Sequence, residues 1–148
     1  MNDAPARMTN TLTTHSEGET AAAGRDLASH LSAGSVVLLF GDLGAGKTAF
    51  VRGLAEGLGV LADDVSSPTF TIMQEYRGGR LPLYHVDLYR LNDPREIDEL
   101  GLGELTDNGI LAIEWAERMP RFPPEAIRVR LEHAGDTERR VAVEGAAG

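Results

Sequence analysis

The hydrophobic pattern changes its period along the chain, and each change predicts an element of structure. Residues 36–40 are all apolar, which is typical of a strand buried on both faces. Residues 47–58 carry apolar side chains three and four positions apart, so we predict a helix with one inward face. An earlier helix should begin after Ser16, because Ser16 and Glu19 have the spacing of a capping box.

Further strands are predicted where short apolar or alternating segments lie between turn residues. Their ranges are 11–14, 69–76, 81–87, 109–114, 127–131 and 140–143. Turn sequences join some of these strands into two hairpins, one around residues 77–80 and one around residues 135–136. One helix, or two short ones interrupted near Gly101 and Gly103, is predicted over about residues 96–105. It should start with Asp93 as its N-cap, because a proline follows directly.

The composition fits a single domain with one hydrophobic core. The chain has 148 residues, of which 42% are hydrophobic. We expect residues 1–10 and 145–148 to be flexible. No apolar run has the length of a membrane span, and no basic segment followed by an apolar stretch opens the chain, so we predict neither membrane insertion nor a secretory signal. The absence of cysteine excludes disulfides and thiolate metal sites, and it is compatible with a cytoplasmic location.

The charge balance argues against direct binding of nucleic acid. The net charge is −9, and Lys47 is the only lysine. Contact with phosphate backbones needs clustered Lys and Arg, so an acidic chain is a poor match for RNA. Any link to RNA should therefore run through a protein partner.

A phosphate-binding loop is predicted between the strand and the helix described first. The segment Gly41-Asp42-Leu43-Gly44-Ala45-Gly46-Lys47-Thr48 has the P-loop pattern. Its glycines let backbone N–H groups approach phosphate oxygens, and the helix that follows points its positive end at them. Lys47 would supply charge for the β- and γ-phosphates, and the Thr48 hydroxyl would take one position on Mg²⁺. The plain alternative is a glycine-rich turn without a ligand.

We expect this loop to bind ATP together with Mg²⁺. Eight consecutive residues are the expected nucleotide contacts. They are Asp42, Leu43, Gly44, Ala45, Gly46, Lys47, Thr48 and Ala49.

Two carboxylates follow apolar strands and are candidates for the metal. Glu114 ends the run 110–113, and Asp87 ends the run 83–86. We expect Glu114 to serve Mg²⁺, directly or through water, because it follows the cleaner apolar run. Asp87 would then orient the attacking water or hold an outer water of the metal. Either residue alone could equally be the solvated end of a strand.

Polar and aromatic residues surround both candidates. His85, Asp87 and Tyr89 alternate, so an extended chain places them on one face. Such a set beside phosphate suggests a segment that responds to the nucleotide, although ordinary surface pairing is the alternative. A lone histidine such as His85 is more often a core residue than a catalytic one. Trp115, the only tryptophan, follows Glu114 and should lie near the metal, unless it simply fills the core.

Thr69 is a candidate in a separate turn. It follows Ser67-Pro68 and precedes Phe70, between a loop and a predicted strand. A threonine there could reach Mg²⁺ or the γ-phosphate, as in loops that become ordered around a triphosphate. The turn preference of serine and proline is the simpler explanation of the segment.

Four segments together resemble the TsaE (YjeE-type) ATPase family, which serves tRNA threonylcarbamoyladenosine synthesis in bacteria. In chain order they are Gly41-Asp42-Leu43-Gly44-Ala45-Gly46-Lys47-Thr48, Ser67-Pro68-Thr69-Phe70, His85-Val86-Asp87-Leu88-Tyr89-Arg90 and Ile113-Glu114-Trp115. A P-loop alone is unspecific, whereas four segments in this order and at this length are specific. The resemblance covers roughly residues 12–133.

The resemblance implies an α/β fold, namely a single P-loop NTPase domain with a mixed, largely parallel sheet flanked by helices. It implies that Thr48 and Glu114 serve Mg²⁺, that Thr69 lies in a first switch and that Asp87 lies in a second. Asp87 and Trp115 match family positions that matter for activity. The expected catalytic set is Lys47, Thr69, Asp87 and Trp115.

The resemblance also implies a partner pair, TsaD and TsaB. ATP hydrolysis would support turnover of their tRNA-modifying cycle, and this chain would meet tRNA only indirectly through them. In that role the chain does not itself join threonylcarbamoyl to adenosine.

Three other functions would share the P-loop. A small-molecule kinase could use Asp87 as its base, but we find no arginine-rich lid and no inserted acceptor domain in so short a chain. A GTP-dependent switch would usually carry an Asn-Lys-x-Asp guanine reader, and no asparagine here precedes a lysine. A module that holds nucleotide without hydrolysing it is disfavoured by Thr48, Asp87 and Glu114.

Overall fold

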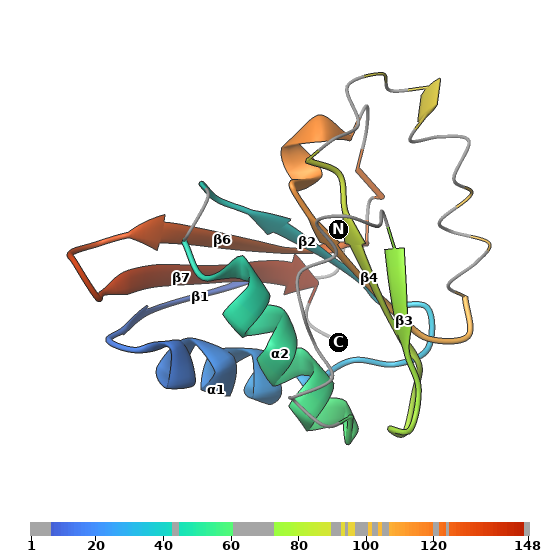
Figure 1. Ribbon diagram of the computed structural model, residues 1–148, viewed down its shortest axis with the longest axis horizontal. Coiled ribbons are helices and arrows are strands. Elements are labelled where there is room, and N and C mark those ends of the chain that lie inside the picture. Colours follow the sequence, from blue (N-terminus) through green and yellow to red (C-terminus); the bar gives the residue numbers. More distant parts are fainter. Residues whose placement is uncertain are drawn as a thin grey trace, which may run out of the picture.

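The computed structural model describes most of the chain in several segments. These are residues 7–42, 45–60, 73–89, 93, 95–96, 101, 104, 107–119, 122–123 and 125–146. The strands are β1 (Arg7–Thr14), β2 (Val36–Phe40), β3 (Met73–Tyr76), β4 (Leu83–Asp87), β5 (Ile110–Glu114), β6 (Ile127–His133) and β7 (Arg139–Ala146). The helices are α1 (Glu17–Ala28), α2 (Lys47–Leu58) and the short 3-10 helix η2 (Ala116–Arg118) (Figure 1). Strands and helices alternate through the first part of the chain, which confirms the α/β class.

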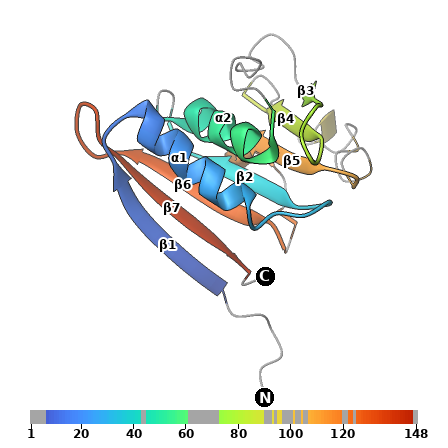
Figure 2. The same ribbon diagram turned by 90° about the horizontal axis from the view of Figure 1, so that it is seen from below.

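The described strands form one mixed sheet with the order β1-β7-β6-β2-β5-β4-β3. The central neighbours β6, β2, β5 and β4 run parallel, whereas β1, β7 and β3 are joined by antiparallel pairing (Figure 2). Because parallel strands end at the same edge of a sheet, the carboxyl ends of β2, β5 and β4 lie side by side. That edge is where ligands bind in open α/β sheets.

Helices α1 and α2 pack against each other on one face of the sheet (Figures 1 and 2). Glycine allows their close approach, since a Cβ on Gly53 would lie 1.8 Å from the carbonyl oxygen of Ala21. Gly24 has the same role, with its Cβ position 2.1 Å from the carbonyl oxygen of Phe50. Helix α2 starts at Lys47, a short loop after the carboxyl end of β2 at Phe40.

Side chains of each central strand alternate between two apolar clusters, one on each face of the sheet. The helix-side cluster includes Leu83 and Ala112. The cluster on the opposite face includes Val86 and Ile113. Asp87 follows Val86 on β4, and Glu114 follows Ile113 on β5, so this alternation places both carboxylates on the helix side of the sheet. The sequence pattern of α2 is confirmed here, because its predicted inward residues Phe50, Val51, Leu54 and Leu58 are all buried.

The ends of the described chain differ from the prediction. The strand predicted over 11–14 is longer, because β1 starts at Arg7 and pairs antiparallel with β7. Likewise the strand predicted over 140–143 is longer, because β7 runs from Arg139 to Ala146. The sequence pattern missed these extensions because they depend on backbone hydrogen bonds between two strands far apart in the chain. No local run of apolar residues marks them. Helix α1 begins as predicted, with Ser16 as its N-cap accepting a hydrogen bond from the Glu19 N–H.

Some predicted elements fall partly outside the described residues. Of the strand expected over 69–76, only β3 is described. The helix expected over 96–105 lies largely outside the described residues. At its start Arg95 and Glu96 are helical, and Asp93 caps them by accepting the Arg95 N–H at 2.9 Å. Among the helices described, none combines the length and the apolar character needed to cross a membrane.

Candidate nucleotide-binding site

Two glycines shape the loop between β2 and α2. Gly41 has a φ of +148°, and a Cβ on it would lie 2.4 Å from the carbonyl oxygen of Leu131. Gly46, with a φ of +103°, is the N-cap of α2 and gives this helix no side-chain cap. The first N–H groups of α2 therefore stay available to an anion, as phosphate binding requires.

Lys47 lies in the first turn of α2 with its side chain buried. Its Nζ donates a 2.6 Å hydrogen bond to the Gly41 carbonyl oxygen and lies 3.7 Å from the centroid of the Trp115 ring. Burial lowers the pKa of Lys47, and four nearby carboxylates oppose that shift. They are Glu114, Glu117, Asp87 and Asp42. The ammonium group is thus held at the loop by a carbonyl oxygen and an indole ring, both weaker partners than a phosphate.

Thr48 and Glu114 meet at the carboxyl edge of the sheet. Thr48 Oγ1 donates to Glu114 Oε2 at 3.4 Å, although one residue lies in the first turn of α2 and the other ends β5. Both groups present oxygen, and Mg²⁺ takes one or two protein oxygens while keeping water and phosphate ligands. The residues predicted for the metal therefore fit it chemically. Across the described segments, no group of three or more Asp, Glu or His side chains is placed to hold a metal ion, so Thr48 and Glu114 would need water and phosphate to complete its shell.

Asp87 is the register partner of Glu114 on the neighbouring strand β4. Its Oδ1 accepts the Tyr89 N–H at 2.8 Å. Burial raises the pKa of Asp87, and the negative charge of Glu114 adds to that shift. The Tyr89 N–H, His85 and Lys47 oppose it. The carboxylate thus stands beside the candidate metal ligand in a partly buried position, where holding its charge is unfavourable.

Trp115 has a strained backbone, and its ring contacts Lys47 and Tyr89. It is the only non-glycine residue with positive φ in the described chain, at +59°. Besides Lys47, its ring packs on the Tyr89 ring at a centroid distance of 5.0 Å. The Arg118 guanidinium lies 5.6 Å from the Tyr89 ring centroid. Strain of this kind is stored at functional sites, and here it turns the chain immediately after Glu114.

His85 is fully buried and contacts Glu114 Oε2 through its Nε2 atom. Its other ring nitrogen, Nδ1, has no hydrogen-bond partner in the described part of the chain. His85 therefore lies in the core, as a lone histidine often does, and it also touches the site. The alternation in the sequence predicted that His85, Asp87 and Tyr89 share one face. In the structure His85 contacts Glu114, Asp87 is the register partner of Glu114, and Tyr89 packs on Trp115.

One contact at the loop was not predicted. Glu117, on η2, accepts the Gly41 N–H at 3.1 Å through its Oε2. Glu117 lies three residues beyond Glu114, which is the only signal in the sequence for its proximity to the loop. It ties the segment after β5 to the start of the P-loop.

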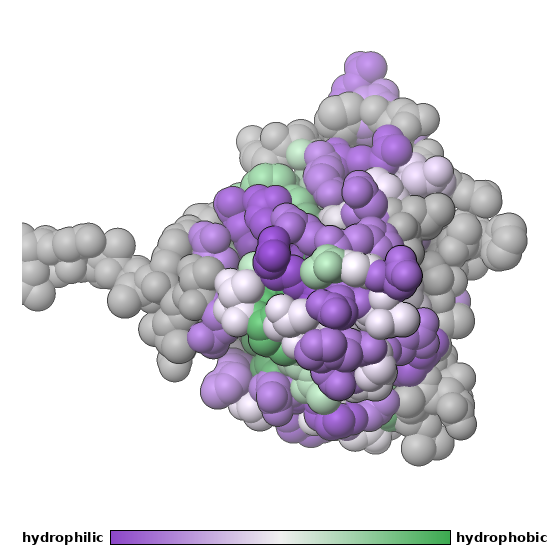
Figure 3. Space-filling model, turned by 90° about the vertical axis from the view of Figure 1, so that its left-hand side faces the viewer, coloured by the Kyte–Doolittle hydropathy of each residue, from purple (hydrophilic) through white to green (hydrophobic). Residues whose placement is uncertain are grey.

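A pocket of about 340 Å³ lies directly beside the P-loop. Its walls are Gly46 and Ala49 of the loop and α2, the start of α1, and the turn between β6 and β7. The other lining residues are His15, Ser16, Glu17, Thr20, Asp136, Thr137 and Arg139. The face on which these elements meet is mostly hydrophilic, with a narrow hydrophobic strip (Figure 3).

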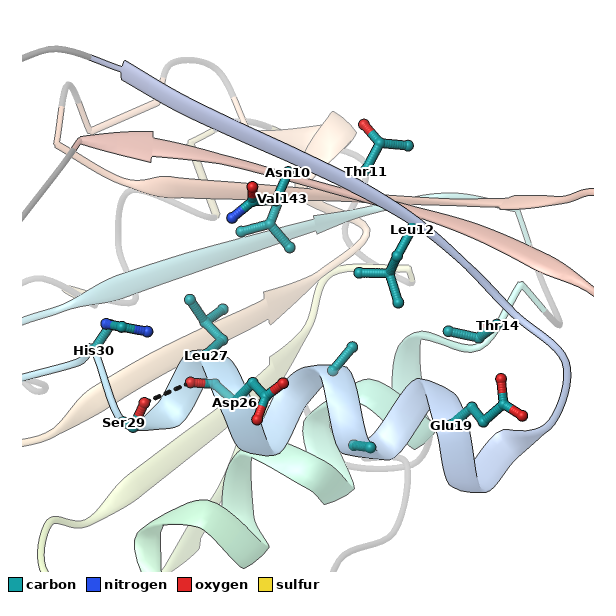
Figure 4. Close-up of a pocket in the computed structure, with 12 residues that line it drawn as sticks. Asn10, Thr11, Leu12, Thr14, Glu19, Asp26, Leu27, Ser29, His30 and Val143 are labelled. Atoms are coloured by element: carbon teal, nitrogen blue, oxygen red, sulfur yellow. Dashed lines mark hydrogen bonds between the residues drawn. The ribbon is translucent and has the colours of Figure 1, made fainter.

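A larger groove of about 690 Å³ lies between β1 and α1. Leu12 and Leu27 point into it from the strand and the helix (Figure 4). None of the predicted site residues lines it, so the larger hollow is not the predicted nucleotide site.

Seven residues of the predicted site or its motifs lie outside the described residues. They are Leu43, Gly44, Ser67, Pro68, Thr69, Phe70 and Arg90. The remaining predicted residues of the P-loop, both carboxylates and Trp115 are brought together at one edge of the sheet.

Known proteins resemble this chain over most of its length. The family model described as Threonylcarbamoyl adenosine biosynthesis protein TsaE matches residues 14–141. The chain is 48% identical over 118 residues to the tRNA threonylcarbamoyladenosine biosynthesis protein TsaE of a Nostoc species, covering 76% of this chain and 72% of that protein. It is 46% identical over 125 residues to the protein of the same name from Bacillus subtilis, covering 83% and 77%.

A solved structure shares the fold as well. The crystal structure of Bacillus subtilis YdiB superposes with a TM-score of 0.75 at 36% identity, covering 96% of this chain and 88% of that one. With a family match over most of the chain and relatives of this similarity, the protein belongs to the TsaE family.

Proposed function

We propose that this protein binds ATP with Mg²⁺ at the P-loop and hydrolyses it in the service of tRNA threonylcarbamoyladenosine biosynthesis. The observation that carries the proposal is the meeting of Lys47, Thr48 and Glu114 at the start of α2. A lysine, a hydroxyl and a carboxylate at that place are the parts that P-loop NTPases use for phosphate and metal. The names of the relatives supply the pathway.

Each residue has a role that follows from its position. Lys47 would leave the Gly41 carbonyl and bind the β- and γ-phosphates, while the N–H groups of α2 hold phosphate oxygens. Thr48 and Glu114 would hold Mg²⁺, Glu114 directly or through water. When bound, Mg²⁺ neutralises charge that develops on the phosphate oxygens.

Asp87 would orient the attacking water and accept its proton. Its raised pKa favours that role, because a carboxylate that is unfavourably ionised gains more from taking up a proton. Trp115 would keep Lys47 in place until the phosphates arrive. Thr69 would join the site from the switch that the family resemblance implies.

The 340 Å³ pocket beside Gly46 is our choice for the adenosine end of ATP. It begins where the P-loop ends, so a nucleotide whose phosphates lie at the start of α2 could extend into it. The lining includes the hydroxyl side chains Ser16, Thr20 and Thr137, which would offer hydrogen bonds to a ribose or a base.

The partners in this proposal are TsaD and TsaB. The net charge of −9 supports contact with proteins over direct contact with tRNA. Cytoplasmic location follows from that role.

The decisive experiment is inorganic phosphate release from ATP and Mg²⁺, measured with the protein alone and with the matching TsaD–TsaB pair. Strong stimulation by the pair is the expected result. Glu114→Gln, which keeps the size of the side chain but removes its charge, should abolish the stimulated release. Phosphate that appears on a small-molecule acceptor instead of in solution would establish the kinase alternative and overturn the proposal.

A further inference from the structure

His85 lies behind the candidate metal site with a fully buried side chain. It stands near the middle of β4, in register with Ala112 of β5 and two residues before Asp87. Its Nε2 contacts Glu114 Oε2, so the contact joins the interior of β4 to the end of β5. Since a carboxylate oxygen only accepts hydrogen bonds, the histidine ring is the donor.

One oxygen of Glu114 is held from two sides. Thr48 Oγ1 reaches the same Oε2 atom from α2 at 3.4 Å. Glu114 is itself only 3% exposed, so its carboxylate has little freedom to turn toward solvent. Its direction is therefore set by the histidine on one side and the threonine on the other.

Packing alone does not explain a histidine at this position. Its Nδ1 is buried without a hydrogen-bond partner in the part of the chain that the structure describes. Burying an unpaired polar atom destabilises a fold, and the β4 positions Leu83 and Val86 show that apolar side chains suit this strand. An apolar residue would serve the core better, so the contact with Glu114 is the feature that only the histidine provides.

We infer that His85 is a positioning residue that fixes the Glu114 carboxylate in the orientation a divalent cation needs beside Thr48. The inference rests on the proposed role of Glu114 in binding Mg²⁺. His85 itself would touch neither the metal nor the nucleotide. Removing a residue that hydrogen-bonds a metal-ligating group typically weakens metal affinity about 10–100-fold.

Three variants separate the hydrogen-bond donor from the bulk of the ring. His85→Gln places an amide N–H at the same reach as Nε2. His85→Asn carries the same amide one methylene shorter, so its donor falls short of Glu114. His85→Leu fills the core without any donor. Each variant would first be tested for folding by thermal unfolding.

The measurement is the affinity for a fluorescent ATP analogue at a series of Mg²⁺ concentrations, with EDTA as the metal-free reference. For His85→Asn and His85→Leu, the Mg²⁺ concentration that gives half of the full rise in nucleotide affinity should be at least about tenfold higher than for the wild type. The nucleotide affinity of both variants in EDTA should change little. His85→Gln should stay within about threefold of the wild type, since it keeps the donor.

Several results would overturn the inference. One is a folded His85→Leu or His85→Asn with the Mg²⁺ requirement of the wild type. Another is a failure of both variants to fold while His85→Gln folds, which would assign His85 to the core alone. A wild type whose nucleotide affinity does not respond to Mg²⁺ would instead overturn the proposed function on which the inference rests, so the two failures are distinguishable.

Discussion

The Lys47 ammonium nitrogen lies 3.7 Å from the centroid of the Trp115 ring. The same atom donates to the Gly41 carbonyl oxygen, so the only lysine of the chain is held between the P-loop backbone and the only tryptophan. Phosphate is a stronger partner for an ammonium group than either of them. Binding of a nucleotide should therefore change the surroundings of the indole ring.

The first prediction uses Trp115 as the reporter. Titration with ATP and Mg²⁺ should change the intrinsic tryptophan fluorescence, because Lys47 leaves the ring for the phosphates. Lys47→Ala should show an altered signal before titration and little response to ATP. An equal response in Lys47→Ala would contradict the contact as its cause.

Lys47→Ala should also abolish tight nucleotide binding. We expect a loss of at least about tenfold in affinity, which corresponds to about 1.4 kcal/mol. Arg25→Ala is a suitable control, because it removes a cation that pairs with Glu56 on the surface of the two helices. Titration with a fluorescent nucleotide would measure both variants, and unchanged affinity in Lys47→Ala would refute the P-loop assignment.

Asp87→Ala should keep nucleotide binding and lose hydrolysis. Because Asp87 acts as an ionised base, the wild-type rate should fall as the pH drops through the pKa of this carboxyl. Burial and Glu114 raise that pKa, so the fall should begin above the ordinary aspartate value of about 3.9. Phosphate release measured against pH would test this, and full turnover in Asp87→Ala would remove Asp87 from the mechanism.

The same shift predicts that Asp87→Asn stabilises the fold at neutral pH. A raised pKa means that the ionised carboxylate destabilises the folded state, and asparagine removes that charge while its Oδ1 can still accept the Tyr89 N–H. The gain should be at most about 2–4 °C in Tm, the effect of 1 kcal/mol in a domain of this size. It should shrink as the pH falls through the raised pKa of Asp87 in the folded state, and it should vanish well below about 3.9, where aspartate is protonated in both folded and unfolded chains. A Tm below that of the wild type at pH 7 would contradict the prediction.

Gly53→Ala should destabilise the protein strongly. The new Cβ would lie 1.8 Å from the Ala21 carbonyl oxygen, so α1 and α2 would have to separate. We expect a loss of about 1–3 kcal/mol or more in the free energy of unfolding. Gly18→Ala is the matched control on α1, since its Cβ would approach only Ser16 Oγ, at 3.7 Å. Urea unfolding of both variants would test this, and equal stability would show that the helix contact tolerates a methyl group.

Local patterns were sufficient to predict the centre of the fold. The apolar run of β2, the glycines of the loop and the inward face of α2 each depend on residues close in sequence. The meeting of Asp87 and Glu114 was also foreseeable in outline, because parallel strands bring their carboxyl ends to one edge. The start of β1 was missed, because residues 7–10 pair with a strand at the other end of the chain.

The sequence by itself determined which chemical groups this protein carries and which end of each strand holds them. Only the tertiary structure decided their contacts, such as the His85 donor on Glu114 and the indole of Trp115 under Lys47. The physical reason is that such contacts depend on strand register, burial and side-chain direction together. Those three properties are fixed when strands and helices pack, not by the spacing of residues along the chain.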